Sequence, residues 1–224
     1  MTKKTLLFGI IIILGTILTT NCKKDKNKND TVTDIDGNVY HIVTIGNQEW
    51  LVENLKTTKY RNGDPIQNVT VDTSWSNLSA GAYSNYNNNS SYADTYGHLY
   101  NWYAVNDSRK IAPDGWHVAT DSEWNTLYTY LGGGNAARDK LKESGTAHWP
   151  SGNTGNNNSG FTALPGGDRD MDGTFKGVGL YSVFWSSSTS SHPLYEYIPN
   201  DNSFMTIVGF DIGRCGFSVR CIKD

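Results

Sequence analysis

Residues 113–131 have the sequence PDGWHVATDSEWNTLYTYL, which contains the clearest helix signal in the chain. Thr120 and Glu123 form a capping box, in which the threonine hydroxyl accepts a hydrogen bond from a free amide of the first turn and the glutamate reaches back to the threonine amide. Apolar side chains then recur at helical spacing at Trp124, Leu127, Tyr128 and Leu131. Gly132 ends the pattern. We therefore predict an amphipathic helix that packs through an aromatic stripe.

The segments on either side of this helix are shorter. A turn at 113–115 leads into a short predicted strand at 116–119. A second short helix is predicted over 136–143, with a thinner apolar face. The residues at 145–160, rich in Gly, Asn and Ser, predict a loop.

Strand signals lie towards the two ends of the remaining chain. Residues 38–45 and 48–55 flank Gly46-Asn47, a dipeptide suited to a tight hairpin turn. Residues 56–110 are dominated by turn and loop residues, with one buried element expected at 97–105. Further short strands are expected at 161–164, 181–185, 194–198, 204–210 and 217–222. Strands at both ends with helices between them predict the α+β class.

The first residues have the composition of an export signal. Two lysines precede an uncharged apolar run at 6–18, which is shorter than the about 20 residues needed to cross a bilayer. We interpret residues 1–21 as a signal peptide. The sequence LTTNC that ends at Cys22 resembles the lipobox of bacterial lipoproteins, with Asn21 in place of the usual small residue. We expect Cys22 to be diacylated; the alternative is an ordinary secretory signal followed by a chance cysteine.

The residues after Cys22 predict a flexible tether over 22–33. Residues 23–30, KKDKNKND, have no apolar side chain to bury and cannot offset the entropy of ordering. Their lysines could meet anionic lipid headgroups, but a solvated spacer is the simpler interpretation. We expect residues 34–224 to form one domain. The expected location is the cell envelope, with the lipid in the outer membrane and the domain exposed at the surface.

Charge and composition argue against nucleic acid as a partner. Removal of the leader leaves 17 basic and 22 acidic side chains, a net charge of −5, so no basic patch is expected. Charged residues make up only 18% of the chain, whereas 23 Gly, 13 Tyr and 7 Trp favour loops and aromatic surfaces.

Cys215 and Cys221 are the two thiols left for the domain. Exported proteins can keep disulfides, but six residues of continuous strand would separate the two Cα atoms by roughly 20 Å, beyond the ~7 Å limit for a bridge. The sequence predicts two free, half-buried thiols. A disulfide is the alternative if the chain turns sharply at Gly216.

Six motifs occur in order and together cover about residues 34–224. They are DIDGNVYHIVTIGNQEWLVENLKTTKY, YGHLYNWYAV, PDGWHVATDSEW, SGFTALPGGDRD, FWSSS and GFSVRCIKD. On these motifs the chain resembles the Fibrobacter succinogenes major paralogous domain family of exported bacterial proteins. The resemblance implies a C-type-lectin-like fold, shared with formylglycine-generating enzymes, in which small antiparallel sheets and two helices support long irregular loops. It also implies that the N- and C-terminal strands lie close together.

The chain departs from the family pattern at its cysteines. Many members have a cysteine shortly before the P-x-G-W-H-V motif, and the resemblance pairs it with the one at Cys221. Ala112 stands near that place here, so Cys221 lacks this partner and Cys215 is an addition.

The residues do not indicate an enzyme. The related oxidase chemistry needs two thiolates for copper, and Cys221 lies in a predicted structural strand. The five histidines show no zincin spacing, and the sequence has no nucleophile elbow or phosphate-binding loop. A copper-dependent oxidase remains an alternative, on fold kinship alone.

A calcium site is one hypothesis for the sequence DRDMDG. Asp168, Asp170 and Asp172 alternate before Gly173, as in the first half of a calcium loop, but the twelfth position is Gly179 and not a bidentate glutamate. A plain polar turn is the alternative. The segment 198–201, IPND, lacks the glutamate of sugar-binding C-type lectins, which argues against calcium-dependent sugar binding there. No other cofactor is expected.

The last third of the chain supplies an aromatic and amide-rich candidate binding face. Tyrosine and tryptophan give rigid contact area with a polar tip, and asparagine both donates and accepts. The candidate residues are Trp185, Tyr195, Tyr197, Asn200, Asn202 and Phe204. Alternate strand residues must face the core, so we expect about half of them to be packing residues.

The sequence thus predicts a non-catalytic, lipid-anchored binding or structural module that engages a glycan or a protein. Two alternatives are kept, the copper-dependent oxidase and an architectural subunit of a surface assembly.

We predict that Cys22→Ala abolishes lipid attachment, because the acylated thiol is lost. Incorporation of radiolabelled palmitate is expected in the wild-type chain and absent in the variant, and protease treatment of whole cells should degrade the wild-type domain. Equal labelling of both chains, or an intact chain with its leader in the cytosol, would contradict the prediction.

Overall fold

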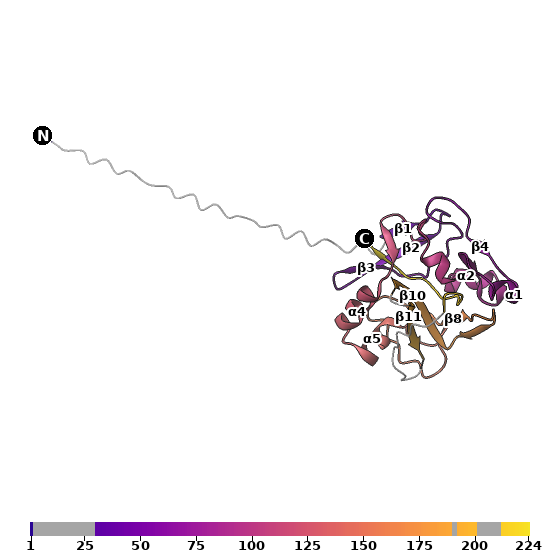
Figure 1. Cartoon of the computed structure of the whole chain (residues 1–224). Helices are drawn as coiled ribbons and strands as arrows, with labels where there is room; N and C mark the ends of the chain where they lie inside the picture. Colours follow the sequence, from indigo (N-terminus) through magenta and orange to yellow (C-terminus); the bar gives the residue numbers. More distant parts are fainter. Residues whose placement is uncertain (2–29, 190–191, 201–211) are drawn as a thin grey trace.

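The computed structural model describes Met1 and residues 30–189, 192–200 and 212–224. Within these ranges the chain forms three β-sheets and several short helices (Figure 1), which confirms the mixed α+β class. The predicted signal peptide, lipidated Cys22 and most of the tether lie outside the described residues.

The first sheet joins the two ends of the domain. Its order is β1 (Thr31–Thr33), β2 (Val39–Ile45), β3 (Gln48–Leu51), β12 (Cys221–Lys223) and β7 (Trp116–Val118), all antiparallel. The predicted β2–β3 hairpin is confirmed, with Ile45 opposite Gln48 and Gly46 at φ +63°, a value that glycine adopts without strain. Because β12 pairs with both β3 and β7, the C-terminal strand lies between an early strand and one from the middle of the chain, and the C-terminus lies near the first strands (Figure 1).

The predicted tether over 22–33 extends too far, because residues 31–33 form strand β1 and pair with β2. The turn that follows holds this edge strand in place. One carboxylate oxygen of Asp34 accepts hydrogen bonds from the amides of Asp36 and Asn38, at 2.9 Å each, and the other accepts from the Tyr40 hydroxyl at 2.7 Å. The predicted turn at 34–37 is confirmed.

The second sheet is mixed. Its order is β11 (Pro193–Pro199), β10 (Tyr181–Thr189), β8 (Gly166–Arg169) and β9 (Phe175–Val178), with β10 and β8 parallel and the other pairs antiparallel. The strands expected at 181–185 and 194–198 are therefore confirmed. The strand expected at 161–164 is reduced to a single bridge at Ala163, and the one at 204–210 lies outside the described residues.

The two predicted helices are present. The first, α4 (Asp121–Tyr130), begins with the predicted capping box: the Glu123 carboxylate accepts from the Thr120 amide at 2.7 Å, and the Thr120 hydroxyl accepts from the Glu123 amide at 3.3 Å. Its Trp124 and Leu127 side chains are buried. The second helix, α5 (Gly134–Leu141), begins and ends two residues earlier than predicted.

The middle of the chain is more regular than its turn-rich sequence suggests. It contains β4 (Gln67–Asn68), α1 (Asp72–Trp75), β5 (Ala82–Ser84), a 3-10 turn η1 (Tyr86–Asn88), α2 (Ser91–Tyr96), β6 (Leu99–Tyr100) and α3 (Trp102–Val105). Strands β4, β5 and β6 form the third sheet. These elements are two to six residues long, and their buried aromatic residues pack against the rest of the domain.

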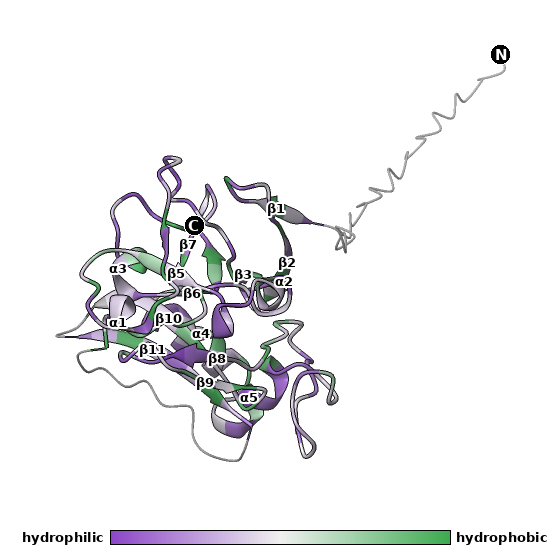
Figure 2. Cartoon of the chain, turned by 90° about the vertical axis from the view of Figure 1, so that its right-hand side faces the viewer, coloured by the Kyte–Doolittle hydropathy of each residue, from purple (hydrophilic) through white to green (hydrophobic). Residues whose placement is uncertain are grey.

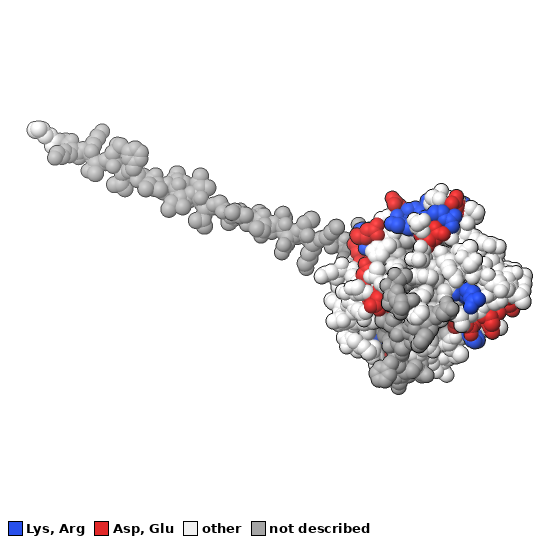
Figure 3. Space-filling model, in the orientation of Figure 1, with Lys and Arg blue, Asp and Glu red and all other residues white. Residues whose placement is uncertain are grey.

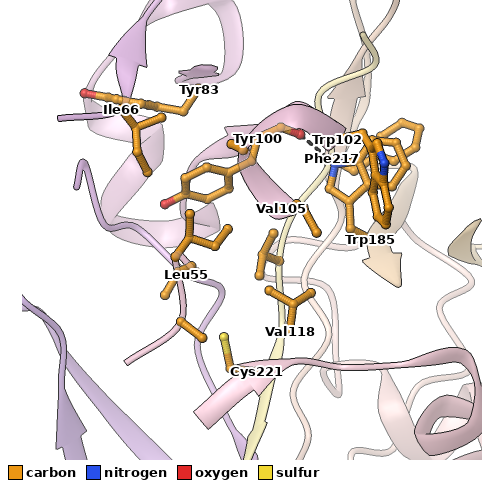
Figure 4. Packing of buried hydrophobic residues seen from close by; sticks show 14 of the residues in the cluster. Leu55, Ile66, Tyr83, Tyr100, Trp102, Val105, Val118, Trp185, Phe217 and Cys221 are labelled. Atoms are coloured by element: carbon orange, nitrogen blue, oxygen red, sulfur yellow. Dashed lines mark hydrogen bonds between the residues drawn. The ribbon is translucent and has the colours of Figure 1, made fainter. Parts of the chain in front are cut away.

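Two large hydrophobic clusters form the core. One, shown in Figure 4, joins the first sheet to α3 and to β10 and includes Tyr100, Trp185 and Phe217. The other lies beneath α4 and α5 and includes Trp50, Trp124 and Phe161. Most of the protruding loops are hydrophilic (Figure 2).

Arg220 lies where the two clusters meet and is 1% exposed. Its guanidinium donates to the carbonyls of Leu51 (3.0 Å) and Phe161 (2.6 Å) and to the side-chain oxygen of Asn54 (2.8 and 3.2 Å). It also stacks 4.1 Å from the centre of the Phe161 ring. Burial lowers the pKa of Arg220 to about 9, so the group stays charged at neutral pH.

The surface in Figure 3 carries small groups of opposite charges side by side, with wide uncharged areas between them. Among the described residues, we find no helix with the length and apolar composition needed to span a bilayer.

We predict that Arg220→Met lowers the free energy of unfolding by at least about 3 kcal/mol, because two carbonyls and an amide lose their buried donors. Urea unfolding followed by tryptophan fluorescence measures this change. Lys223→Met, at the end of the strand that Arg220 precedes, is the matched control. Its ammonium is about half exposed, so we expect a loss below about 1 kcal/mol. Similar losses in the two variants would contradict the prediction.

Candidate functional site

One face of the second sheet borders a cavity of about 340 Å³. This size lies at the small end of the usual range for small-molecule sites. The lining combines aromatic rings, two carboxylates, an ammonium and a thiol. The lining residues are Asp168, Asp170, Met171, Lys176, Tyr181, Val183, Tyr195, Tyr197, Ile212, Cys215 and Phe217.

Strand alternation separates the polar side of β8 from its buried side. Asp168 lies opposite Lys176 across the β8–β9 pair, and Arg169 lies opposite Phe175. Since successive side chains of a strand point to opposite faces, Asp168 turns towards the cavity and Arg169 turns away from it. Asp170, two residues after Asp168, also lines the cavity.

Arg169 stabilises the β8–β9 hairpin on the face opposite the cavity. Its fully buried guanidinium donates to the carbonyls of Gly173 (2.9 Å) and Val69 (2.5 Å) and to the carboxylate of Asp72 (2.9 Å). It also lies 4.4 Å from the centre of the Trp75 ring. These contacts connect the β8–β9 turn to the β4–α1 region and hold the cavity wall in place.

Tyr181 makes the central polar contact of the cavity. Its hydroxyl donates to the Asp168 carboxylate at 2.5 Å. Its ring packs directly on Gly177, where an added Cβ would lie 2.0 Å from the ring and where φ is +76°. Burial raises the pKa of Asp168 to about 6, although the hydrogen bond from Tyr181 acts in the opposite direction.

The second carboxylate has a charged partner. Lys176 forms an ion pair with Asp170, whose carboxylate also accepts from the Met171 amide at 2.7 Å. This contact raises the pKa of Lys176. Cys215 lies on the same lining, and burial raises the pKa of its thiol to about 12.

The structure brings two predicted binding residues to this cavity and buries a third. Tyr195 and Tyr197 line the cavity and are partly exposed. Trp185 shares their sheet face, opposite Tyr195, but it is fully buried. The ring of Phe217 covers it at 4.4 Å, and its indole N–H donates to the Tyr100 carbonyl at 2.6 Å. The prediction that Trp185 belongs to a binding face is therefore wrong.

Of the three predicted residues that follow β11, the structure describes only Asn200, which does not line the cavity. Asn200 lies outside the lining, and its carbonyl and side-chain oxygens accept from the Lys142 ammonium at 3.3 and 3.4 Å. Asn202 and Phe204 lie outside the described residues, as does Cys22.

The three carboxylates of the predicted calcium loop have different partners. Asp168 accepts from Tyr181, Asp170 pairs with Lys176, and Asp172 accepts from the amide and hydroxyl of Thr174 at 2.9 and 2.6 Å. In the described part of the chain, no three acidic, histidine or cysteine side chains are grouped so that they could hold a metal ion. Residues 170–173 form a polar turn between β8 and β9, and the calcium site stays a prediction.

Cys215 and Cys221 are both free, which confirms the prediction of two thiols, but they are more deeply buried than predicted, at 5% and 0% exposure. Burial raises the pKa of each to about 12, which disfavours the thiolates that copper(I) requires. Cys221 lies in the core near Val118 (Figure 4), whereas Cys215 borders the cavity.

A second cavity, of about 280 Å³, lies between α3 and β7 and is lined by His117 and Ser187 among other residues. The two ring nitrogens of His117 are bound to Asp224 (2.7 Å) and Glu123 (2.9 Å), and the Ser187 hydroxyl donates to the Val118 carbonyl at 2.6 Å. His117 and Ser187 thus do not form a base and nucleophile pair. We therefore place the candidate site at the first cavity, where charge and aromatic rings meet.

Sequence reasoning missed Tyr181, Lys176 and Cys215 as members of the site. The pairing of the strands would have identified the first two. Tyr181 lies two residues before Val183 and so shares its sheet face, and Val183 pairs with Tyr197. The pairing also places Lys176 opposite Asp168. Cys215 reaches the site through a loop, so no local pattern indicates it.

The family comparison agrees with the sequence motifs. The model of the Fibrobacter succinogenes major domain matches residues 43–223. Neither the curated proteins nor the solved structures gave a match.

We predict that Tyr181→Phe raises the pKa of Asp168 above about 6, because the carboxylate loses its hydroxyl donor. A charged hydrogen bond contributes about 1.5–3 kcal/mol, so the proton affinity should rise about tenfold or more. Carbon-13 NMR titration of the aspartate carboxyls measures the change. Tyr130→Phe, at an exposed tyrosine of α4, is the control and should leave the titration unchanged. An unaltered Asp168 titration in Tyr181→Phe would contradict the assignment.

Proposed function

The chain belongs to the Fibrobacter succinogenes major domain family, and we propose that it is a non-catalytic binding module of the bacterial cell envelope. Its ligand is a glycan or a protein, bound at the cavity on the second sheet. The observation that carries this proposal is the meeting of Tyr181, Tyr195 and Tyr197 with Asp168 in one small cavity. Rigid aromatic area beside a few polar groups is typical of recognition sites.

The proposal includes a lipid anchor at Cys22 and a domain exposed on the outer membrane. Its support is the apolar run at 6–18 followed by a cysteine, and then the lysine-rich residues 23–30. The first described strand, β1, begins at Thr31, so about eight residues separate the lipid from the domain. That short spacer would keep the domain close to the membrane.

We also propose that the fold is C-type-lectin-like. Three features support this: the C-terminal strand lies between β3 and β7, α4 and α5 follow β7 directly, and long irregular segments connect the sheets. A binding function would suit such a fold, because binding residues are often carried by loops on a rigid scaffold.

The oxidase alternative finds less support. It needs paired thiolates for copper, and Cys215 and Cys221 are both deeply buried with raised pKa values. A titration with copper(I) that found a stoichiometric site would restore it. The architectural alternative differs only in its partner and is addressed by the same test as the proposal.

The proposal predicts that the full-length chain in detergent binds at least one member of a panel of glycans, host matrix proteins and envelope proteins, with the last obtained by pull-down from native membranes. Tyr197→Ala should weaken that binding at least tenfold, because an aromatic contact contributes about 1.4 kcal/mol or more. Tyr130→Ala, an exposed tyrosine away from the cavity, is the matched control and should bind like the wild type.

Two outcomes would count against the proposal. Absence of binding to the whole panel would remove the recognition function. Equal effects of Tyr197→Ala and Tyr130→Ala would move binding away from the cavity.

A further inference from the structure

The two carboxylates of the cavity differ in how their charge is balanced. Asp170 pairs with the Lys176 ammonium. Asp168 receives one hydrogen bond from the neutral Tyr181 hydroxyl, at 2.5 Å. Within the described residues, Asp168 has no ion pair of its own. A carboxylate held partly out of water without a cation is unfavourable unless a positive partner arrives.

Four aromatic rings line the cavity together with this carboxylate. The rings of Tyr181 and Tyr197 lie 5.1 Å apart, and those of Tyr195 and Phe217 also lie 5.1 Å apart. All four line the same cavity. The faces of aromatic rings attract ammonium groups within about 6 Å, and this attraction grows when water is excluded.

From this juxtaposition we propose that the cavity is a receptor for an alkylammonium group, with Asp168 as its counter-charge and the tyrosines as its walls. The inference rests on the proposed function, because it names the chemistry of the ligand at the same site. At about 340 Å³, the cavity suits one small head group better than a large ligand. The rest of the ligand, whether glycan, lipid or protein, would lie outside.

The remaining charges of the cavity favour a cation over an anion. Lys176 is the ammonium of the lining and pairs with Asp170; on the pKa of Asp168, the opposing effects of these two charges are smaller than that of burial. The Cys215 thiol and the hydroxyls of Tyr181 and Tyr195 are uncharged at neutral pH, because their ordinary pKa values lie above 7 and burial raises them further. Asp168 therefore gives the cavity a net negative charge when it is ionised.

The first test compares choline with 3,3-dimethyl-1-butanol, which has the same shape with carbon in place of the charged nitrogen. Isothermal titration uses the full-length chain in detergent at pH 8. We expect choline to bind at least tenfold more tightly than the alcohol. Equal affinity for the two, or no binding of choline, would overturn the proposal.

Two single substitutions then test whether Asp168 is the carboxylate that binds choline. Asp168→Asn should weaken choline binding at least tenfold, whereas Asp172→Asn should leave it unchanged, because Asp172 is exposed and bound to Thr174. The thermal unfolding curve of each variant confirms that it is folded. Unchanged choline binding in a folded Asp168→Asn chain would overturn the role of Asp168.

The pH dependence provides a further readout. With the pKa of Asp168 at about 6, only about a tenth of the carboxyl is ionised at pH 5, so choline affinity should fall about tenfold between pH 8 and pH 5. Asp168→Asn should lose this dependence. The same pH dependence in wild type and variant would contradict the proposal.

The outcomes separate this inference from the proposed function. A neutral glycan or a protein that binds while choline does not would leave the binding function standing and overturn the ammonium preference. Choline binding without any ligand from the wider panel would support the receptor and overturn the proposed class of partners.

Discussion

The Arg220 guanidinium is the contact on which the rest of the structure depends most. It holds together three segments that are far apart in the sequence: the residues just before the C-terminal strand, the stretch from the end of β3 at Leu51 to Asn54, and the loop at Phe161. A planar group with several fixed donors satisfies carbonyls in different directions at once. Because no carboxylate contacts this guanidinium among the described residues, its charge is balanced by backbone and amide dipoles and by the Phe161 ring. Each of these acceptors would be left buried and unsatisfied without it.

Buried arginines solve a general problem of this loop-rich domain. Long irregular segments carry many carbonyls that have no partner in a helix or sheet, and buried carbonyls need donors. Arg169 serves this purpose at the β8–β9 turn, where it binds Gly173 and Val69. The same alternation that turns Arg169 inward turns Asp168 and Asp170 towards the cavity. The packing of the turn and the chemistry of the site therefore come from three consecutive residues of the sequence.

The acidic side chains of the domain differ in whether a cationic side chain pairs with them. Most described acidic groups near the surface pair with a nearby lysine, arginine or histidine, and Asp168 does not. Aromatic rings and the Tyr181 hydroxyl lie beside it in the cavity, and the effect of burial on its pKa is larger than the effects of Tyr181, Asp170 and Lys176. An ammonium ligand would supply the partner that the fold leaves out. The proposed binding function and its proposed ligand chemistry thus rest on the same carboxylate.

The sequence alone determined the local elements. The capping box at Thr120 and Glu123 and the Gly46-Asn47 turn act between residues less than five positions apart, so α4 and the β2–β3 hairpin could be predicted. The burial of Trp185 could not, because its partners Tyr100 and Phe217 come from segments far away, the first 85 residues earlier. The buried element expected at 97–105 is present as β6 and α3, but the other short elements of residues 56–110 escaped prediction, since packing against the domain and not local propensity stabilises them. The sequence identified Asp168 only as a candidate calcium ligand, because only the tertiary structure brings Tyr181, Lys176 and Cys215 to the same cavity.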